Sequence, residues 1–390
     1  MVNAFHLSRI PRIIFGPGTL KKLPSLLEEF GNHYLIITGA TSFQSGYSGR
    51  NLLNSLEVGD NIIYRSRIIK EPSPSDVDDI VMEYCGKEIN AVAGIGGGSV
   101  LDAAKAVSAM LRIGGSVREY VEGVGTKGHP GIKIPFIAVP TTAGTGSEST
   151  ENAVLSEIGT DGFKRSLRHP NLMPDIALID PELTIACPPE ITSASGMDAL
   201  TQLVESYISV SANTFTDSLA EEAIRLVISN LPQAVKNGKN LNARKALSYS
   251  AMISGITMAN AGLGVVHGFA SSVGGCIDIP HGVLCGTLLG AANRIILNNL
   301  MVADPNNTVI VKYAKLGKYF SETDNLTEGE YAVQLIELLE KLVDDLKLPR
   351  IGNYGLKAEM SEDIIDNTSQ KNNPVKLSKD ELLQILRSRI

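Results

Sequence analysis

Three side chains in the second half of the sequence are of types that bind divalent metal ions. Asp198 lies in a helical pattern, and His267 and His281 follow it 14 residues apart, each with a glycine directly after it. A carboxylate and two imidazoles can hold a cation and leave positions open for a substrate, as in catalytic metal sites. A single histidine in an apolar region is more often a core or capping residue, so spacing alone leaves both interpretations open.

A glycine-rich segment in the first half has the character of a phosphate-binding turn. Residues 96–105 (GGGSVLDAAK) follow an apolar run and open a helical pattern. Glycines let the backbone approach a ligand closely, and a helix start offers free N–H groups at the positive end of the dipole. The glycines are consecutive, so this is not the GxGxxG fingerprint. We predict a pyrophosphate seat, the alternative being a turn that binds nothing.

A second segment with similar chemistry follows another apolar run. Residues 140–150 (PTTAGTGSEST) crowd hydroxyls and glycines directly after residues 136–139. A run of Thr and Gly can be a simple turn. In open α/β sheets, however, ligands bind outside the carboxyl ends of the strands. Two such segments at the same edge therefore favour a shared ligand.

The elements that must position these residues differ between the two halves. In the first half, apolar runs alternate with amphipathic segments at 75–84 and 100–111, which predicts a mainly parallel sheet covered by helices. The predicted strands are Tyr34–Thr38, Ile62–Tyr64, Ala91–Ile95, Phe136–Val139 and Ile176–Ile179.

The second half has helical periodicity throughout. The proline-containing run at 180–190 marks the change, so we predict an α/β domain over 1–185 and an all-helical domain over 186–390. The predicted helices are Ile191–Val210, Asp217–Ser229, Ala243–Met258, Val283–Leu297, Ala332–Leu346 and Lys379–Arg389.

Composition excludes several classes of protein. The chain has 390 residues, 43% hydrophobic and 20% charged, with a formal net charge of −7. No basic footprint for nucleic acid and no membrane-spanning or secretory segment is evident. The four cysteines are scattered without a CxxC pair and are interpreted as buried or incidental thiols in a reducing compartment. We expect a cytoplasmic protein.

Taken together, the motifs resemble those of the iron-containing (group III) alcohol dehydrogenases. GGGSVLDAAK, PTTAGTGSE, PDIALIDP at 174–181, SGMDAL at 195–200 and the two glycine-flanked histidines occur in that family's order. The resemblance runs from about residue 13 to the C-terminus. It implies a dehydroquinate-synthase-like fold, with a Rossmann-like nucleotide-binding α/β domain, a helical domain and the active site between them.

The resemblance also assigns roles to residues. Positions that match the family's pyrophosphate-binding turn are Gly97, Gly98, Ser99 and Asp102. Positions that match residues around the cofactor's adenine, ribose and phosphates are Thr141, Thr142 and Thr145. Asn152 and Lys164 match positions near the cofactor and the catalytic cleft, and Asp198, His267 and His281 match three metal ligands.

Two departures concern the metal. The family's fourth ligand is a histidine one helical turn after the aspartate, and here that position is Gln202, on the same helix face as Asp198. An amide oxygen is a weaker ligand for Fe²⁺ or Zn²⁺ than imidazole, so water or Gln202 completes the site, or the metal is lost. Ser271 stands where the family often has a histidine, which removes one candidate proton carrier.

Two departures concern the cofactor. Many NAD-using members have an aspartate after the strand that corresponds to Tyr34–Thr38, whereas this chain has Gly39, followed by Ala-Thr-Ser. Without that charge, NADP is acceptable as well as NAD. Glu71 stands where the family commonly has Asn, and the sequence gives it no role.

A strongly basic segment, residues 164–169 (KRSLRH), permits two interpretations. Arg168 or His169 binds an anionic group of the substrate, or the segment is a solvated loop in which Lys164 alone faces the cleft. The second is the simpler one and is preferred here.

The sequence thus predicts a metal-assisted NAD(P)-dependent oxidoreductase that interconverts a small alcohol and its aldehyde or ketone. Catalytic roles are expected for Asp198, His267, His281 and Lys164. The resemblance also implies a homo-oligomer, such as a dimer. Two alternatives are a lyase of the same fold resembling dehydroquinate synthase, and a cofactor-binding member that has lost metal and catalysis.

Overall fold

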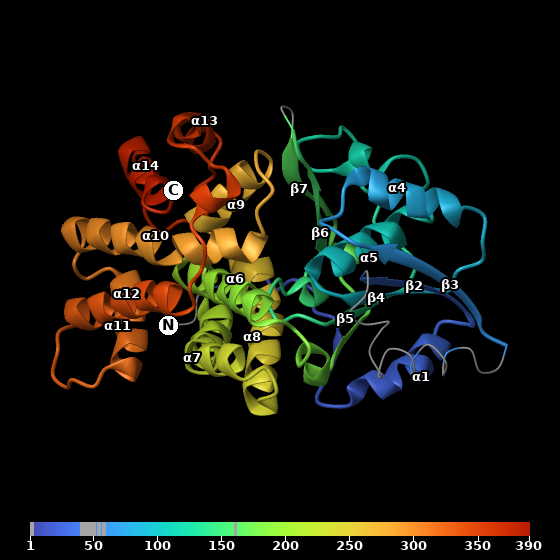
Figure 1. Cartoon of the computed structure of the whole chain (residues 1–390), viewed down its shortest axis with the longest axis horizontal. Helices are drawn as coiled ribbons and strands as arrows, with labels where there is room; N and C mark the ends of the chain where they lie inside the picture. Colours follow the sequence, from blue (N-terminus) through green and yellow to red (C-terminus); the bar gives the residue numbers. More distant parts are fainter. Residues whose placement is uncertain (1–3, 40–51, 53–55, 57–59, 160–161) are drawn as a thin grey trace.

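The chain folds into an α/β half and a helical half that lie side by side (Figure 1). The computed structural model describes residues 4–39, 52, 56, 60–159 and 162–390. The predicted fold class is confirmed: a parallel sheet occupies the first half and helices the second. The three residues that follow Gly39 lie outside the described part.

The α/β half is built on a six-stranded sheet in the order β1-β8-β5-β4-β2-β3, with every pair parallel. The strands are β1 (Arg12–Phe15), β2 (His33–Gly39), β3 (Ile62–Ile68), β4 (Ala91–Gly96), β5 (Phe136–Pro140) and β8 (Ile176–Ile179). All five predicted strands are present. The edge strand β1 was not predicted from the sequence.

Successive side chains of a strand point to opposite faces of the sheet. Both faces are buried here, because helices cover each of them. In β2, Leu35 and Ile37 pack on the face covered by α4 (Pro74–Glu83) and α5 (Gly98–Met110). Tyr34 and Ile36 pack on the other face, with α1 (Leu23–Glu28). This two-sided burial explains why the central strands are continuous apolar runs.

A β-hairpin projects from the α/β half toward the helices (Figure 1). It consists of β6 (Asn152–Glu157) and β7 (Phe163–Arg168), paired antiparallel. The preferred interpretation of residues 164–169 as a solvated loop is therefore wrong. Phe163 and Leu167 lie on the same face of the strand and pack into the α/β core. The charged side chains between and after them conceal this pattern in the sequence.

The second half is helical throughout its described length. Its helices are α6 (Pro189–Ile208), α7 (Thr214–Lys236), α8 (Leu241–Ala261), α9 (Val265–Gly274), α10 (His281–Ala303), α11 (Thr308–Phe320), α12 (Glu328–Asp345), α13 (Ser361–Asp366) and α14 (Lys379–Arg387). The six predicted helices correspond to α6, α7, α8, α10, α12 and α14. The sequence interpretation missed α9, α11 and α13.

Helix α10 lies at the centre of the helical half. Its length and composition would allow it to cross a membrane, but 78% of its most apolar window is buried inside the protein. It packs against α6, α9, α12 and α14. We therefore interpret α10 as the core helix of the bundle.

The two halves approach each other through glycines. Gly146, whose φ is +63°, lies against Gly255 of α8, and a Cβ atom on Gly255 would fall 2.3 Å from the Gly146 carbonyl oxygen. Such a separation is far inside van der Waals contact, so a side chain would push the halves apart. The N-terminal segment also reaches the helical half, where the Ser8 N–H donates to Asn260 Oδ1 at 2.7 Å.

Candidate active site

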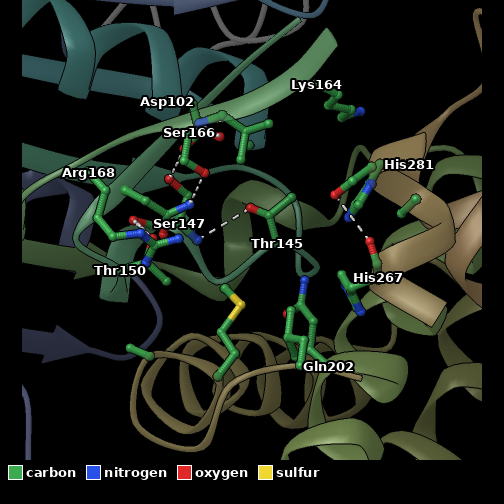
Figure 2. Close-up of a pocket in the computed structure, with 18 of the residues that line it drawn as sticks. Asp102, Thr145, Ser147, Thr150, Lys164, Ser166, Arg168, Gln202, His267 and His281 are labelled. Atoms are coloured by element: carbon green, nitrogen blue, oxygen red, sulfur yellow. Dashed lines mark hydrogen bonds between the residues drawn. The ribbon is translucent and has the colours of Figure 1, made fainter. Parts of the chain in front are cut away.

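A cavity of about 700 Å³ lies between the two halves. Its α/β wall includes the start of α5, the segment after β5 and the β6–β7 hairpin, and its helical wall includes α6, α8, α9 and the start of α10 (Figure 2). We call this space the interdomain cleft. Cavities of this size between domains are typical of small-molecule sites.

The predicted pyrophosphate seat is a helix start without a side-chain cap. Gly97 is the N-cap of α5, and no side chain bonds to the N–H groups of the first turn there. The first N–H groups to donate to Gly97 O are those of Val100 and Leu101. The N–H groups of Gly98 and Ser99 precede them at the positive end of the helix dipole, where an anion is stabilised.

The two glycine-rich segments contact each other, as their position at one sheet edge predicted. The Thr141 N–H donates to Gly96 O at 2.9 Å across the ends of β4 and β5. The Thr145 side chain lies so close to Gly98 that a Cβ there would fall 2.5 Å from Thr145 Cγ2. Gly98 is therefore required by packing, and its backbone stays accessible from the cleft.

A buried charged network fixes the hairpin to this seat. Asp102 accepts hydrogen bonds from Ser147 Oγ and from the Val154 N–H of β6. Lys105 is fully buried, and its Nζ donates to Ser147 O at 2.8 Å and to Asn152 O at 2.7 Å. Burial raises the pKa of Asp102 and lowers that of Lys105 to about 8.

The predicted metal ligands come together at the helical wall. His267 Nε2 lies 3.7 Å and His281 Nε2 lies 3.5 Å from the same oxygen, Asp198 Oδ1. Each lies near a helix start: His281 is the first residue of α10, and His267 is the third of α9. Among the described residues, Asp198 Oδ1 is a buried atom without a hydrogen-bond partner. A buried, unpartnered carboxylate oxygen facing two imidazoles fits a bound cation.

The fourth member of this cluster is a residue that the sequence analysis set aside. Asp198, His267, His281 and Cys285 each offer one ligand atom, and these atoms all lie within 4.8 Å of one another. Cys285 follows His281 by four residues on α10, so both lie on one helix face. That spacing was the available signal, and it was missed because only paired cysteines were considered.

The charges of the cluster stabilise one another. Burial raises the pKa of Cys285, but the adjacent imidazoles of His267 and His281 more than offset this and leave the pKa lowered. Burial likewise raises the pKa of Asp198, and the same two rings reverse the direction. Thiolate and carboxylate are the metal-binding forms of these groups.

Glu205 supports the site from behind. Its Oε2 lies 2.6 Å from His267 Nδ1, and its Oε1 accepts from the Val266 N–H at 2.6 Å. The carboxylate therefore caps the start of α9 and orients the imidazole on it. Asp198, Gln202 and Glu205 have the i, i+4, i+7 spacing of one face of α6.

Gln202 lines the cleft, and its amide oxygen lies next to a hydroxyl group. Ser254 Oγ donates to Gln202 Oε1 at 2.6 Å, and the side chain points into the cavity toward Thr145 (Figure 2). Ser271 also lines the cleft, and its hydroxyl donates to His267 O at 3.2 Å.

Glu71, which had no predicted role, pairs with Lys164. Lys164 Nζ lies 2.7 Å from both Glu71 carboxylate oxygens. The Lys164 side chain is 8% exposed and the Glu71 side chain 38% exposed. Both residues line the cleft, so the pair forms a fixed charged wall of it.

The two other charged residues considered in the basic segment differ in position. Arg168 lines the cleft and pairs with Glu122 at 3.1 Å. His169 accepts from the Asn171 N–H at the end of β7 and is not among the lining residues.

Most of the predicted site residues meet in one place. Those lining the cleft are Gly98, Ser99, Asp102, Thr145, Asn152, Lys164, Gln202, His267 and His281. Those not lining it are Gly39, Gly97, Thr141, Thr142 and Asp198. Gly97 and Asp198 directly support lining residues, whereas Gly39 ends β2 beside residues outside the described part.

Comparison with known proteins decides the family. Residues 11–181 match the family model for iron-containing alcohol dehydrogenase, and residues 192–390 match the model for the C-terminal part of that family. The chain belongs to the iron-containing alcohol dehydrogenase family.

Relatives in the family align over almost the whole chain. Long-chain-alcohol dehydrogenase 1 of Geobacillus thermodenitrificans is 32% identical over 93% of this chain and 91% of its own length. The 1,3-propanediol dehydrogenase of Citrobacter freundii is 31% identical over 97% of both chains. Among solved structures, alcohol dehydrogenase from Oenococcus oeni is 29% identical, with a TM-score of 0.87 over 99% of this chain and 100% of that one.

Membership of the iron-containing alcohol dehydrogenase family establishes the class of reaction. The chain is an alcohol–aldehyde oxidoreductase, as the sequence predicted, and these relatives are named as dehydrogenases rather than as lyases.

Proposed function

We propose that this chain is a metal-assisted, NAD(P)-dependent oxidoreductase that interconverts a small alcohol and its aldehyde or ketone. The observation that carries the proposal is the position of two clusters on opposite walls of one cavity. The start of α5 offers N–H groups for a pyrophosphate, and the two histidines with Asp198 offer ligands for a cation. A substrate between them would contact both.

The cofactor is held by the α/β wall in this proposal. Gly97, Gly98 and Ser99 bind the pyrophosphate through backbone N–H groups, and Asp102 fixes the turn through Ser147. The adjoining threonines, Thr141, Thr142 and Thr145, and Asn152 border the rest of the cofactor. Gly39 carries no charge that would repel a 2′-phosphate, which supports use of either NAD or NADP.

The metal, Fe²⁺ or Zn²⁺, is held by Asp198, His267 and His281. The unpartnered Asp198 oxygen supports this assignment, and it opposes the alternative of a family member that has lost its metal. When bound, the metal polarises the substrate oxygen and the nicotinamide gives or takes the hydride.

The protein's own groups orient the reactants and limit water. Glu205 fixes the His267 ring, and Glu71 fixes the ammonium group of Lys164 at the cleft wall. The helical wall is partly apolar, with Met258, Leu263 and Ala270 among its lining residues. Such a wall suits the carbon chain of a small alcohol.

Three further assignments complete the proposal. The two domains are residues 1–185 and 186–390, which agrees with the end of β8 at Ile179 and the start of α6 at Pro189. The enzyme acts in the cytoplasm, in agreement with its four unpaired cysteines. It assembles as a homo-oligomer such as a dimer.

The test combines elemental analysis with a screen for turnover. Purified protein is analysed for iron and zinc, and NADH and NADPH oxidation is followed with short-chain, hydroxy-acid and sugar-derived aldehydes. We expect bound metal and catalytic turnover with at least one aldehyde. Bound cofactor with no metal and no turnover across the panel would instead favour the inactive cofactor-binding alternative.

A further inference from the structure

Cys285 is the fourth of four potential ligand residues that cluster in the helical half, with Asp198, His267 and His281. We call their four ligand atoms the cage. Cys285 Sγ lies 3.6 Å from His281 Nε2 and 3.7 Å from His267 Nε2. These are the same two nitrogens that lie 3.5 Å and 3.7 Å from Asp198 Oδ1. These four separations therefore have similar lengths, all four atoms lie within 4.8 Å of one another, and the thiol is fully buried.

Those four separations can be compared with the distances between ligands of a four-coordinate zinc ion. With zinc–nitrogen bonds of about 2.1 Å and a zinc–sulfur bond of about 2.3 Å, nitrogen and sulfur ligands lie about 3.6 Å apart. The two sulfur–nitrogen separations match this within about 0.1 Å. The two oxygen–nitrogen separations are slightly longer than the roughly 3.4 Å that zinc bonds of about 2.1 Å to both atoms give.

Gln202 is poorly arranged to be the fourth ligand. Its only metal-binding atom, Oε1, lies 2.6 Å from Ser254 Oγ, so this hydroxyl competes with a metal ion for the oxygen. Its side chain turns into the cleft, toward Thr145 (Figure 2). By contrast, the unpartnered Asp198 oxygen belongs to the cage that contains Cys285.

We propose that Cys285, rather than Gln202, is the fourth protein ligand of the metal, and that the site consequently selects zinc over iron. The proposal rests on the metal-dependent function proposed above. On binding, the Cys285 sulfur–metal bond forms and the thiol proton passes to solvent. A thiolate is a softer ligand than an amide oxygen, and soft ligands favour Zn²⁺ over Fe²⁺. Gln202 keeps its place on the cleft wall, and a substrate oxygen would bind as a fifth ligand.

The first experiment uses cobalt as a spectroscopic probe. Full-length protein is stripped with a chelator and loaded with Co²⁺ alone, and its absorption spectrum is recorded. We expect an intense near-ultraviolet sulfur-to-cobalt charge-transfer band in the wild type, in Gln202→Leu and in the control Cys276→Ser, whose thiol is exposed. Cys285→Ser should lose the band.

A second measurement avoids any variant that fails to fold. X-ray absorption at the zinc edge of wild-type protein loaded with Zn²⁺ should show one sulfur neighbour at about 2.3 Å. A shell of nitrogen and oxygen alone would overturn the proposal. Competition between Zn²⁺ and Fe²⁺ should favour zinc in the wild type, and this preference should shrink in Cys285→Ser.

The outcomes separate the two proposals. Cobalt bound without the charge-transfer band, or a band that survives in Cys285→Ser, would overturn the Cys285 assignment and leave the metal-dependent function intact. Protein that binds no Co²⁺ would overturn both.

Discussion

Glu205 and His267 form a hydrogen-bonded pair behind the cluster of ligands, with Glu205 Oε2 at 2.6 Å from His267 Nδ1. With Nδ1 donating to this carboxylate, Nε2 of the neutral ring carries the free lone pair, and Nε2 is the nitrogen that faces Asp198. A carboxylate in this position also makes the imidazole a stronger ligand.

Replacing Glu205 with Gln should therefore weaken metal binding without removing a ligand. The amide can still accept from the Val266 N–H, but it lacks the charge that strengthens the imidazole. We expect Zn²⁺ affinity to fall roughly 10- to 100-fold, measured by calorimetric titration of chelator-treated protein. Glu322→Gln, at an exposed position, is the control. Unchanged affinity in Glu205→Gln would show that the pair does not support the site.

The Glu71–Lys164 pair should be energetically coupled. Lys164→Met leaves the Glu71 carboxylate without its partner in the cleft, where it repels the phosphates of an approaching cofactor. We expect weaker NADH binding in Lys164→Met and partial recovery in Glu71→Gln/Lys164→Met, with a coupling of about 1 kcal/mol or more. Fluorescence titration with NADH gives the four affinities of the cycle. Additive effects would contradict the coupling.

Gly39 should determine which nicotinamide cofactor is preferred. A Cβ added there would lie 3.8 Å from Val100 Cγ2, an ordinary contact, so a side chain fits. In Gly39→Asp the new carboxylate should repel a 2′-phosphate and raise the NADPH-to-NADH ratio of KM values at least about tenfold. Gly39→Ala controls for bulk alone. An equal ratio in all three proteins would mean that the 2′-position of the cofactor's ribose does not lie near residue 39.

The contribution of Glu148 to the free energy of unfolding should decrease as the pH rises. Burial raises the pKa of this carboxyl to about 7 in the folded protein, from 4.5 when exposed. As the pH rises, the unfolded chain therefore releases this proton at a lower pH than the folded protein does. The resulting stabilisation is complete below about pH 4.5 and is lost as the pH rises through about 7.

Glu148→Gln should remove this dependence. We expect the variant to gain up to about 3 kcal/mol over the wild type above neutral pH, and little at acidic pH. Urea unfolding followed by far-ultraviolet circular dichroism at several pH values measures the difference. A gain of the same size at every pH would indicate improved packing rather than the loss of a titrating group.

The sequence predicted the elements whose pattern is set by burial. The central strands are buried on both faces, so β2, β4 and β5 are apolar runs that can be recognised without a structure. The hairpin was missed because charged side chains of β7 surround its two buried apolar residues, Phe163 and Leu167. One of these charges, Lys164, is paired with Glu71, which is distant in the sequence.

The candidate site was predicted only as far as its motifs extend. Asp198, His267 and His281 were recognised by their spacing and family resemblance. Cys285 and Glu205 were not. The spacing of Cys285 from His281 indicates a shared helix face, but the contacts of Cys285 and Glu205 with His267 arise from the crossing of α6, α9 and α10. Spacing on one helix shows that side chains share a face, but it does not show what that face meets.

The central claim, metal-dependent hydride transfer, is tested most directly by titrating chelator-treated protein with Zn²⁺ and with Fe²⁺ while following oxidation of NADH and NADPH by an aldehyde that the wild type reduces. We predict no turnover without metal, a rise that saturates at one ion per chain, and no turnover by His267→Ala at any metal concentration. Undiminished turnover by the metal-free protein or by His267→Ala would contradict the account.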